Sequence, residues 1–384
     1  MAADNKKAVA WLSASHMVLD IYGGFINPIM PFIAVKLGFT MALATVIVAV
    51  TQICSNMLQP IFGFFADNIL KRFFIFWGLI IASVFIPLAP SAPNVWLLTI
   101  CMICGCLGGS FFHPQSLGFV KTFSEKNYSA NMGIFVSLGS FGFALGPLLA
   151  AYITQYAGLE KIAYTSFLGL ALASCMFFFV PKISLYEKKP EHKEFFKSFK
   201  EILANRQMDY LILVSMMKSL VTNSTCILLP FLWKSMGYSV FYIGFALFLF
   251  VFMGSVGSFV SPKLESLIGS KPILYISMTL TFPLMILFAL TYKTMPILSM
   301  FMFGLIGFVT MLAQPVILVW AQKTLPQFKS VTAGFINGFC WGATALFLSG
   351  MGAVAQKFGI INVLMVMTFI PVFSCYYIKF LKEE

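Results

Sequence analysis

Charged residues are scarce in this chain. Among its 384 residues, 10% are charged and only 13 are acidic, whereas 60% are hydrophobic. A typical soluble domain carries about 25% charged residues, and it has no core that could bury this much apolar side chain. The composition excludes a soluble protein and indicates an integral membrane protein.

The chain also lacks the groupings typical of an enzyme or a metalloprotein. Its eight cysteines fall within apolar runs, where cysteine acts as a small apolar residue, so we expect no disulfide framework. No loop brings a nucleophile and a base together, and no soluble domain interrupts the apolar runs. We therefore expect no enzymatic activity, no catalytic residue, no metal and no cofactor. A membrane enzyme or a non-transporting receptor is the alternative class.

Apolar runs of about 20 residues, each long enough to cross a bilayer, recur along the chain. Twelve begin near residues 9, 41, 73, 94, 128, 161, 208, 239, 272, 295, 329 and 360. Alternate connections place 19 lysines and arginines on one side and five on the other. The positive-inside rule makes the basic side, with both termini, cytoplasmic. The net charge of +12 then reflects topology, not nucleic-acid binding, and we expect a multi-pass protein of a bacterial inner (plasma) membrane.

The one long polar connection divides the chain into two halves. It predicts two six-helix bundles, 1–181 and 207–384, joined by a cytoplasmic linker, 182–206. In the linker, apolar residues that include Phe199 and Ile202 recur at helical spacing opposite lysines. This pattern predicts a short amphipathic helix on the membrane surface. A solvated charged linker is the alternative.

The two halves share residues at nearly constant offsets. Pro31, Phe32 and Gly38 recur 199 residues later as Pro230, Phe231 and Gly237, and Pro114, Gly133 and Gly158 recur 201 residues later as Pro315, Gly334 and Gly359. Such matches favour an internal duplication, which is typical of transporters built from repeats. We expect runs 1, 4, 7 and 10 to line a central path.

The first run carries an acidic residue deep inside its apolar stretch, which none of the other eleven does. His16, Asp20, Gly23 and Asn27 are spaced by four, three and four residues, so on one helix they form a single polar stripe. At about 1.5 Å per residue, Asp20 lies roughly 15 Å into a hydrocarbon layer of about 30 Å. An acid at that depth is usually functional and has a partner. His16, one turn away, is the nearest candidate.

Four titratable side chains remain inside the apolar runs: His16, Asp20, His113 and Lys218. Desolvation favours a protonated carboxyl, whereas a neighbouring imidazolium favours the carboxylate, so a small change can move a proton near neutral pH. We predict that Asp20 takes up the proton and that His16 and His113 tune or relay it. A static ion pair between helices is the alternative. Lys218 is either an anchor for an anionic substrate or the counter-ion of Asp20.

Polar side chains in the runs expected to line the path, or in runs 2, 5, 8 and 11, which we expect beside the path, are the candidate substrate contacts. They are Lys218, Asn27, Gln52, Asn223, Gln314 and Tyr22.

Two further motifs carry a family resemblance. Gly63, Asp67, Lys71 and Arg72 resemble the signature loop between helices 2 and 3 of the major facilitator superfamily, although Asn68 and Leu70 depart from its usual residues. Gly142, Gly146 and Pro147 resemble its antiporter motif, with alanines in place of the last glycines. The resemblance implies a gating role for the first set and an export role for the second. Packing alone is the alternative for the glycines, because small residues let membrane helices approach closely.

A subgroup resemblance rests on fewer residues. Ser15, His16 and Asp20, together with Phe112, His113 and Pro114, are similar to the fosmidomycin resistance protein group. The resemblance implies a proton-coupled antiporter that exports small drug-like or anionic compounds by alternating access. Its partners would be the small-molecule substrate, protons and the lipid bilayer, and we expect a monomer. A proton symporter importing a small organic anion or a peptide-like solute is the alternative.

Overall fold

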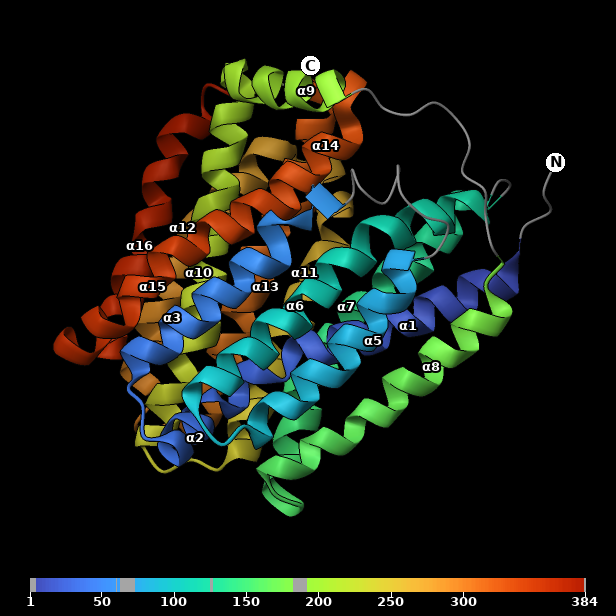
Figure 1. Cartoon of the computed structure of the whole chain (residues 1–384). Helices are drawn as coiled ribbons and strands as arrows, with labels where there is room; N and C mark the ends of the chain where they lie inside the picture. Colours follow the sequence, from blue (N-terminus) through green and yellow to red (C-terminus); the bar gives the residue numbers. More distant parts are fainter. Residues whose placement is uncertain (1–4, 60, 63–72, 125–126, 182–191, 383–384) are drawn as a thin grey trace. The chain divides into compact units, whose positions relative to one another are not determined.

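The computed structural model describes residues 5–59, 61–62, 73–124, 127–181 and 192–382. Within these ranges the chain is helical and has no strand (Figure 1). Eleven helical segments there are long and apolar enough to cross a membrane. A shorter apolar segment, Met41–Met57, stands where the second span is expected. The predicted all-α membrane fold is confirmed.

The helices follow the apolar runs in order. The first half contains α1 (Lys6–Gly24), α2 (Ile26–Leu37), α3 (Met41–Gln52), a π-helical turn (Ile53–Met57), α5 (Phe73–Leu88), α6 (Val95–Thr122), α7 (Tyr128–Tyr156), a 3₁₀ segment (Leu159–Thr165) and α8 (Ser166–Phe179). The second half contains α9 (His192–Ala204), α10 (Arg206–Ser235), α11 (Val240–Ile268), α12 (Ser270–Thr291), α13 (Pro296–Thr324), α14 (Lys329–Gly334), a π-helical turn (Phe335–Phe339), α15 (Cys340–Phe358) and α16 (Ile360–Ile378).

The chain forms two compact units, which we call unit 1 and unit 2. Unit 1 comprises Met1–Phe39, Cys54–Pro190 and Ser239–Phe245, and unit 2 comprises Thr40–Ile53, Glu191–Tyr238 and Ala246–Glu384. The units depart from the expected bundles in two short segments, which start at Thr40 and Ser239. These starts are 199 residues apart, which is the offset of the repeat. In unit 2, α3 packs along α15.

Turn geometry supports the internal duplication. Gly38 and Gly237 have φ angles of 70° and 83°, and Gly158 and Gly359 have φ angles of 102° and 88°. Positive φ strongly favours glycine because a Cβ would clash with the backbone. Each repeat therefore ends corresponding helices with the same left-handed turn.

The first span, Lys6–Leu37, is interrupted at one residue, Phe25, between the residues of the predicted polar stripe. α1 ends at Gly24, and α2 begins at Ile26. Pro28 has no N–H to donate to the carbonyl of Gly24, so the regular helical ladder is interrupted at this point. His16 and Asp20 share α1, whereas Asn27 lies on α2.

The linker contains the predicted helix, α9, but two of its apolar side chains, those of Phe199 and Ile202, face protein. Ile202 is fully buried in a core that also contains Met208 and Trp320. Phe199 packs with its ring centroid 5.0 Å from that of Phe335, in the π-helical turn of unit 2. In Figure 1, α9 lies across the ends of α10 and α14. This packing corrects the expectation that these side chains rest on the membrane surface.

Candidate functional site

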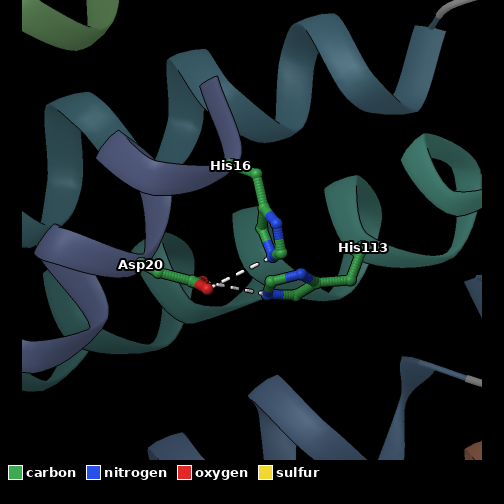
Figure 2. Close-up of side chains that lie close together, drawn as sticks. All are labelled: His16, Asp20 and His113. Atoms are coloured by element: carbon green, nitrogen blue, oxygen red, sulfur yellow. Dashed lines mark ion pairs between the residues drawn. The ribbon is translucent and has the colours of Figure 1, made fainter. Parts of the chain in front are cut away.

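In unit 1, three of the predicted polar residues meet between α1 and α6. The Nε2 atom of His16 lies 3.2 Å from one carboxylate oxygen of Asp20, and the Nε2 atom of His113 lies 3.5 Å from the other. Figure 2 shows the carboxylate reaching toward both imidazoles. We call this group the carboxylate–histidine cluster. Its side chains are 10%, 18% and 24% exposed for His16, Asp20 and His113, so the cluster is mostly but not fully shielded.

The sequence spacing explains why these groups meet. Asp20 follows His16 by four residues, which places both side chains on one face of α1. His113 lies one turn after Gly109 on α6, where an added Cβ would be in ordinary contact, 3.7 Å from the Ser55 hydroxyl and 3.9 Å from the His113 ring. The two helices, α1 and α6, contact each other within unit 1.

The imidazole of His16 is held on three sides. Its ring stacks on that of Phe135 at 4.1 Å and on that of Phe112 at 6.2 Å. Its Nδ1 atom lies 2.9 Å from the backbone oxygen of Phe135 on α7. A Cβ added to Gly139 would lie 2.2 Å from the ring, so glycine is needed there for the ring to fit.

This geometry fixes where a proton must be. A carbonyl oxygen only accepts hydrogen bonds, so the Nδ1 atom of His16 carries the hydrogen in its contact with Phe135. The Nε2 atom, 3.2 Å from the Asp20 carboxylate, is then an acceptor unless it is protonated as well. Two acceptors attract each other only with a proton between them. The observed contact therefore requires a proton on either His16 or Asp20.

The same three groups are the ones that could hold a metal ion. Their ligand atoms all lie within 4.8 Å of one another, and imidazole nitrogens with a carboxylate oxygen are a ligand set that zinc uses. In the part of the chain that the structure describes, no other group of three or more histidine, cysteine, aspartate or glutamate residues has its ligand atoms this close together. The absence of a metal and of a cofactor stays a prediction.

In unit 2, two predicted substrate contacts come together. The ammonium of Lys218 on α10 donates a hydrogen bond to the side-chain oxygen of Gln314 on α13. The side-chain nitrogen of Gln314 in turn donates to the side-chain oxygen of Asn337. The ammonium also lies 4.8 Å from the ring centroid of Trp341 on α15. We call these four residues the lysine network.

Two other predicted substrate contacts hold helices together. Tyr22 is fully buried; its hydroxyl donates to the backbone oxygen of Thr165 at 2.7 Å and accepts from the backbone nitrogen of Gly169 at 3.0 Å. The side chain of Asn223 is 3% exposed and donates to the hydroxyl of Thr344 at 3.0 Å. Their polar groups join α1 to α8 and α10 to α15. Their assignment to the substrate path stays a prediction.

The remaining predicted residues are less informative. Asn27 on α2 and Gln52 at the end of α3 are both half-buried, and Gln52 lies in unit 2. The predicted gating residues lie outside the residues that the structure describes. They are Gly63, Asp67, Lys71 and Arg72.

The glycines of the antiporter motif mark a close helix crossing. A Cβ added to Gly142 would lie 2.2 Å from the backbone oxygen of Met17, and one added to Gly146 would lie 2.3 Å from that of Ile21. Pro147 contacts the same surface, because a Cβ on Gly24 would lie 2.7 Å from its ring. The motif thus sets the distance between α1 and α7, and it places Phe135 beside His16. Its export role stays a prediction.

Several residues of these sites carry no signal in the sequence. Phe135 contributes a backbone oxygen, which any residue could supply, and Asn337 and Trp341 lie in an apolar run that we expected beside the path. Asn337 lies in the π-helical turn Phe335–Phe339. A second π-helical turn, Ile53–Met57, lies beside α6, where the hydroxyl of Ser110 reaches the Cys54 and Ser55 oxygens. Such turns are frequent at functional sites, but no sequence pattern predicts them.

The helical fold and the buried polar clusters define a multi-pass membrane transporter. The family model for the Major Facilitator Superfamily matches residues 12–349, and the chain belongs to this family. Two solved structures share the fold: a mutant of the nucleoside transporter NupG (TM-score 0.79, 14% identity, covering 98% of this chain and all of that one), and a bacterial homologue of the lysosomal transporter Spinster in an inward-facing, occupied conformation (TM-score 0.72, 14% identity, covering 97% and 93%).

Curated relatives include proteins of drug resistance. The fosmidomycin resistance protein of Escherichia coli is 25% identical over 373 residues, which cover 94% of this chain and 89% of that protein. An MFS-type transporter of Bacillus subtilis is 22% identical and covers 93% and 88%. The quinolone resistance protein NorA of Staphylococcus aureus is 24% identical over 148 residues, 38% of each chain. The predicted family resemblance, including its fosmidomycin resistance group, is confirmed.

Proposed function

We propose that this protein is a proton-coupled antiporter that exports small drug-like or anionic compounds by alternating access. It works as a monomer in a bacterial plasma membrane, with both termini in the cytoplasm, and it uses the proton gradient in place of a bound cofactor. The carboxylate–histidine cluster is the proton site. The substrate binds in unit 2, at the lysine network, and its release outside the cell completes the transport cycle.

One observation carries the proton assignment. The His16 Nδ1 atom is committed to the Phe135 oxygen, so the contact between His16 and Asp20 exists only while a proton lies on one of them. Loss of that proton leaves two acceptors 3.2 Å apart in a mostly shielded site, which is unfavourable. Deprotonation therefore favours movement of Asp20 away from His16. A mechanical change that depends on one proton is the element that a coupled carrier needs.

The direction of transport is supported by two findings. Two of the curated relatives are resistance proteins, one for fosmidomycin and one for quinolones. The close α1–α7 crossing is built on Gly142 and Gly146 of the antiporter motif. Both favour export over import.

Transport in membrane vesicles tests the proposal. Inverted vesicles with an acidic interior should accumulate fosmidomycin or a quinolone, and the accumulation should disappear when the pH gradient is collapsed. Asp20→Asn should lose gradient-driven accumulation, whereas Glu160→Gln, a control at an acid whose side chain is 69% exposed, should keep it. Gradient-driven accumulation in right-side-out vesicles instead would show a symporter and contradict the proposal.

A further inference from the structure

The lysine network contains a buried amino group with no acid beside it. The Lys218 side chain is fully buried on α10. Among the described residues, the ion pairs are those of His16 and His113 with Asp20, Lys36 with Glu160, and Lys197 with Glu201. None of them includes Lys218. Asp209, the acid on the same helix, is nine residues away, which is about 13.5 Å along the axis.

The partners that Lys218 does have are neutral. It donates to the amide oxygen of Gln314 and lies 4.8 Å from the ring centroid of Trp341. An amide dipole and an aromatic face each stabilise an ammonium, but neither cancels its charge. A buried ammonium that keeps its charge gains most from an anion within hydrogen-bond distance. The site is therefore electrostatically incomplete without one.

The hydrogen bonds of the network are donated in one direction, from Lys218 through Gln314 to the side-chain oxygen of Asn337. The side-chain nitrogen of Asn337 then donates to no described residue, and the Asn337 side chain is exposed. An amide nitrogen has two hydrogens, and an ammonium has three, of which Gln314 uses one. An arriving oxyanion meets the Asn337 nitrogen first and can replace Gln314 as the acceptor for Lys218.

The internal repeat relates this network to the proton site, but the two positions carry side chains of opposite charge type. Offsets of 199 and 201 residues relate Ser215 to His16 and Gln314 to His113, and Lys218 lies one residue before the equivalent of Asp20. Backbone contacts correspond as well: Ser215 donates to the Ile336 oxygen at 3.3 Å, as His16 does to Phe135 at 2.9 Å. The same helices of each repeat thus hold an acid in unit 1 and a base in unit 2.

We propose that Lys218, Gln314, Asn337 and Trp341 form a binding site for the oxyanion group of a small aromatic or otherwise apolar organic anion. The ammonium and the Asn337 amide hold the oxyanion, and the Trp341 ring packs against the apolar part. This inference rests on the proposed function only in treating the anion as the transported substrate. Asn337 and Trp341 give the site its selectivity for an anion that carries an apolar body.

Equilibrium binding to detergent-solubilised protein tests this site without a gradient. The probes are benzoate, phenylacetate and indole-3-acetate, each compared by calorimetry with its neutral amide. We expect at least one acid to bind about ten-fold more tightly than its amide, since hydrogen bonds to charged groups are among the strongest. Lys218→Met should remove this preference, and Lys263→Met, a control at an exposed lysine of α11, should leave it unchanged.

Two further variants keep the outcome clear. Asn337→Ala changes an exposed side chain, so it should fold even where Lys218→Met does not, and it should reduce the preference about three-fold or more. Asp20→Asn should keep the preference while it loses proton coupling, which separates failure of this site from failure of the proton mechanism. The inference is overturned if no acid is preferred over its amide in the unmodified protein, or if Asn337→Ala leaves the preference intact.

Discussion

The carboxylate of Asp20 lies 3.5 Å from the imidazole of His113, although 93 residues separate them. One turn before Asp20 on α1, His16 contacts the other oxygen of the same carboxylate at 3.2 Å. The carboxylate is thus held by two helices of unit 1, and one proton decides whether the contact with His16 is attractive. The proposed proton coupling is assigned to this cluster because a change of charge here would alter a contact made by α1.

Gly139→Ala should disable the proton site without replacing any titratable residue. The added Cβ would lie 2.2 Å from His16, so the ring must leave its position against Phe135 and lose the hydrogen bond of its Nδ1 atom. We expect gradient-driven transport to fall about ten-fold or more, because a buried polar group left without its hydrogen-bond partner costs about 1–3 kcal/mol. Transport rates in vesicles measure this.

The matched control is Gly133→Ala on the same helix, where an added Cβ meets nothing within 4 Å. It should transport at the normal rate. Equal losses in both variants would show that α7 tolerates no alanine, and the assignment of Gly139 to the site would fail.

Tyr22→Phe should lower stability and leave substrate affinity unchanged. The change removes the hydroxyl that joins the Thr165 oxygen and the Gly169 nitrogen, and both backbone groups lose their partner in a buried place. A buried polar group without a partner costs about 1–3 kcal/mol, so the thermal unfolding midpoint in detergent should fall. Tyr152→Phe, at a side chain that is 54% exposed, should not change the midpoint. A change in substrate affinity with no loss of stability would place Tyr22 in the substrate path.

Phe199→Ala should loosen α9 from unit 2. The ring packs at 5.0 Å against Phe335 and at 6.4 Å against Phe339, both in the π-helical turn that carries Asn337. Because Phe199 is only half-buried, we expect a loss of about 1–3 kcal/mol, less than for a fully buried phenylalanine. Thermal unfolding of the purified protein measures this loss.

A matched control lies on the same helix. Leu203 is 56% exposed, so Leu203→Ala should be close to neutral. If Leu203→Ala destabilises the protein more than Phe199→Ala does, α9 rests on the membrane with its other face, and its packing on unit 2 is not what stabilises it.

Much of the fold could be predicted from the sequence, because spans in a bilayer must be long and apolar. α3, α7, α14 and α16 begin at the predicted residues, Met41, Tyr128, Lys329 and Ile360. The break at Phe25 was missed because the apolar run continues through it. Hydropathy reports burial in lipid, whereas the break depends on the missing N–H of Pro28.

The sites were predicted only in part, for a related reason. An acid or a lysine inside an apolar run is visible in the sequence, so Asp20, His113 and Lys218 could be singled out. Whether a polar side chain faces a path or fastens two helices depends on what lies opposite, which one sequence does not show. The buried hydrogen bonds of Tyr22 and the role of the Phe135 backbone oxygen could therefore not be predicted.

Proton release on substrate binding tests the central claim most directly. Fosmidomycin or a quinolone is added to the detergent-solubilised protein in weak buffer between about pH 6 and pH 8, a range around the ordinary pKa of histidine. We expect the unmodified protein to release protons as it binds the compound, and Asp20→Asn to bind it without release. Equal release from both proteins would contradict the assignment of Asp20 and its two histidines as the proton site.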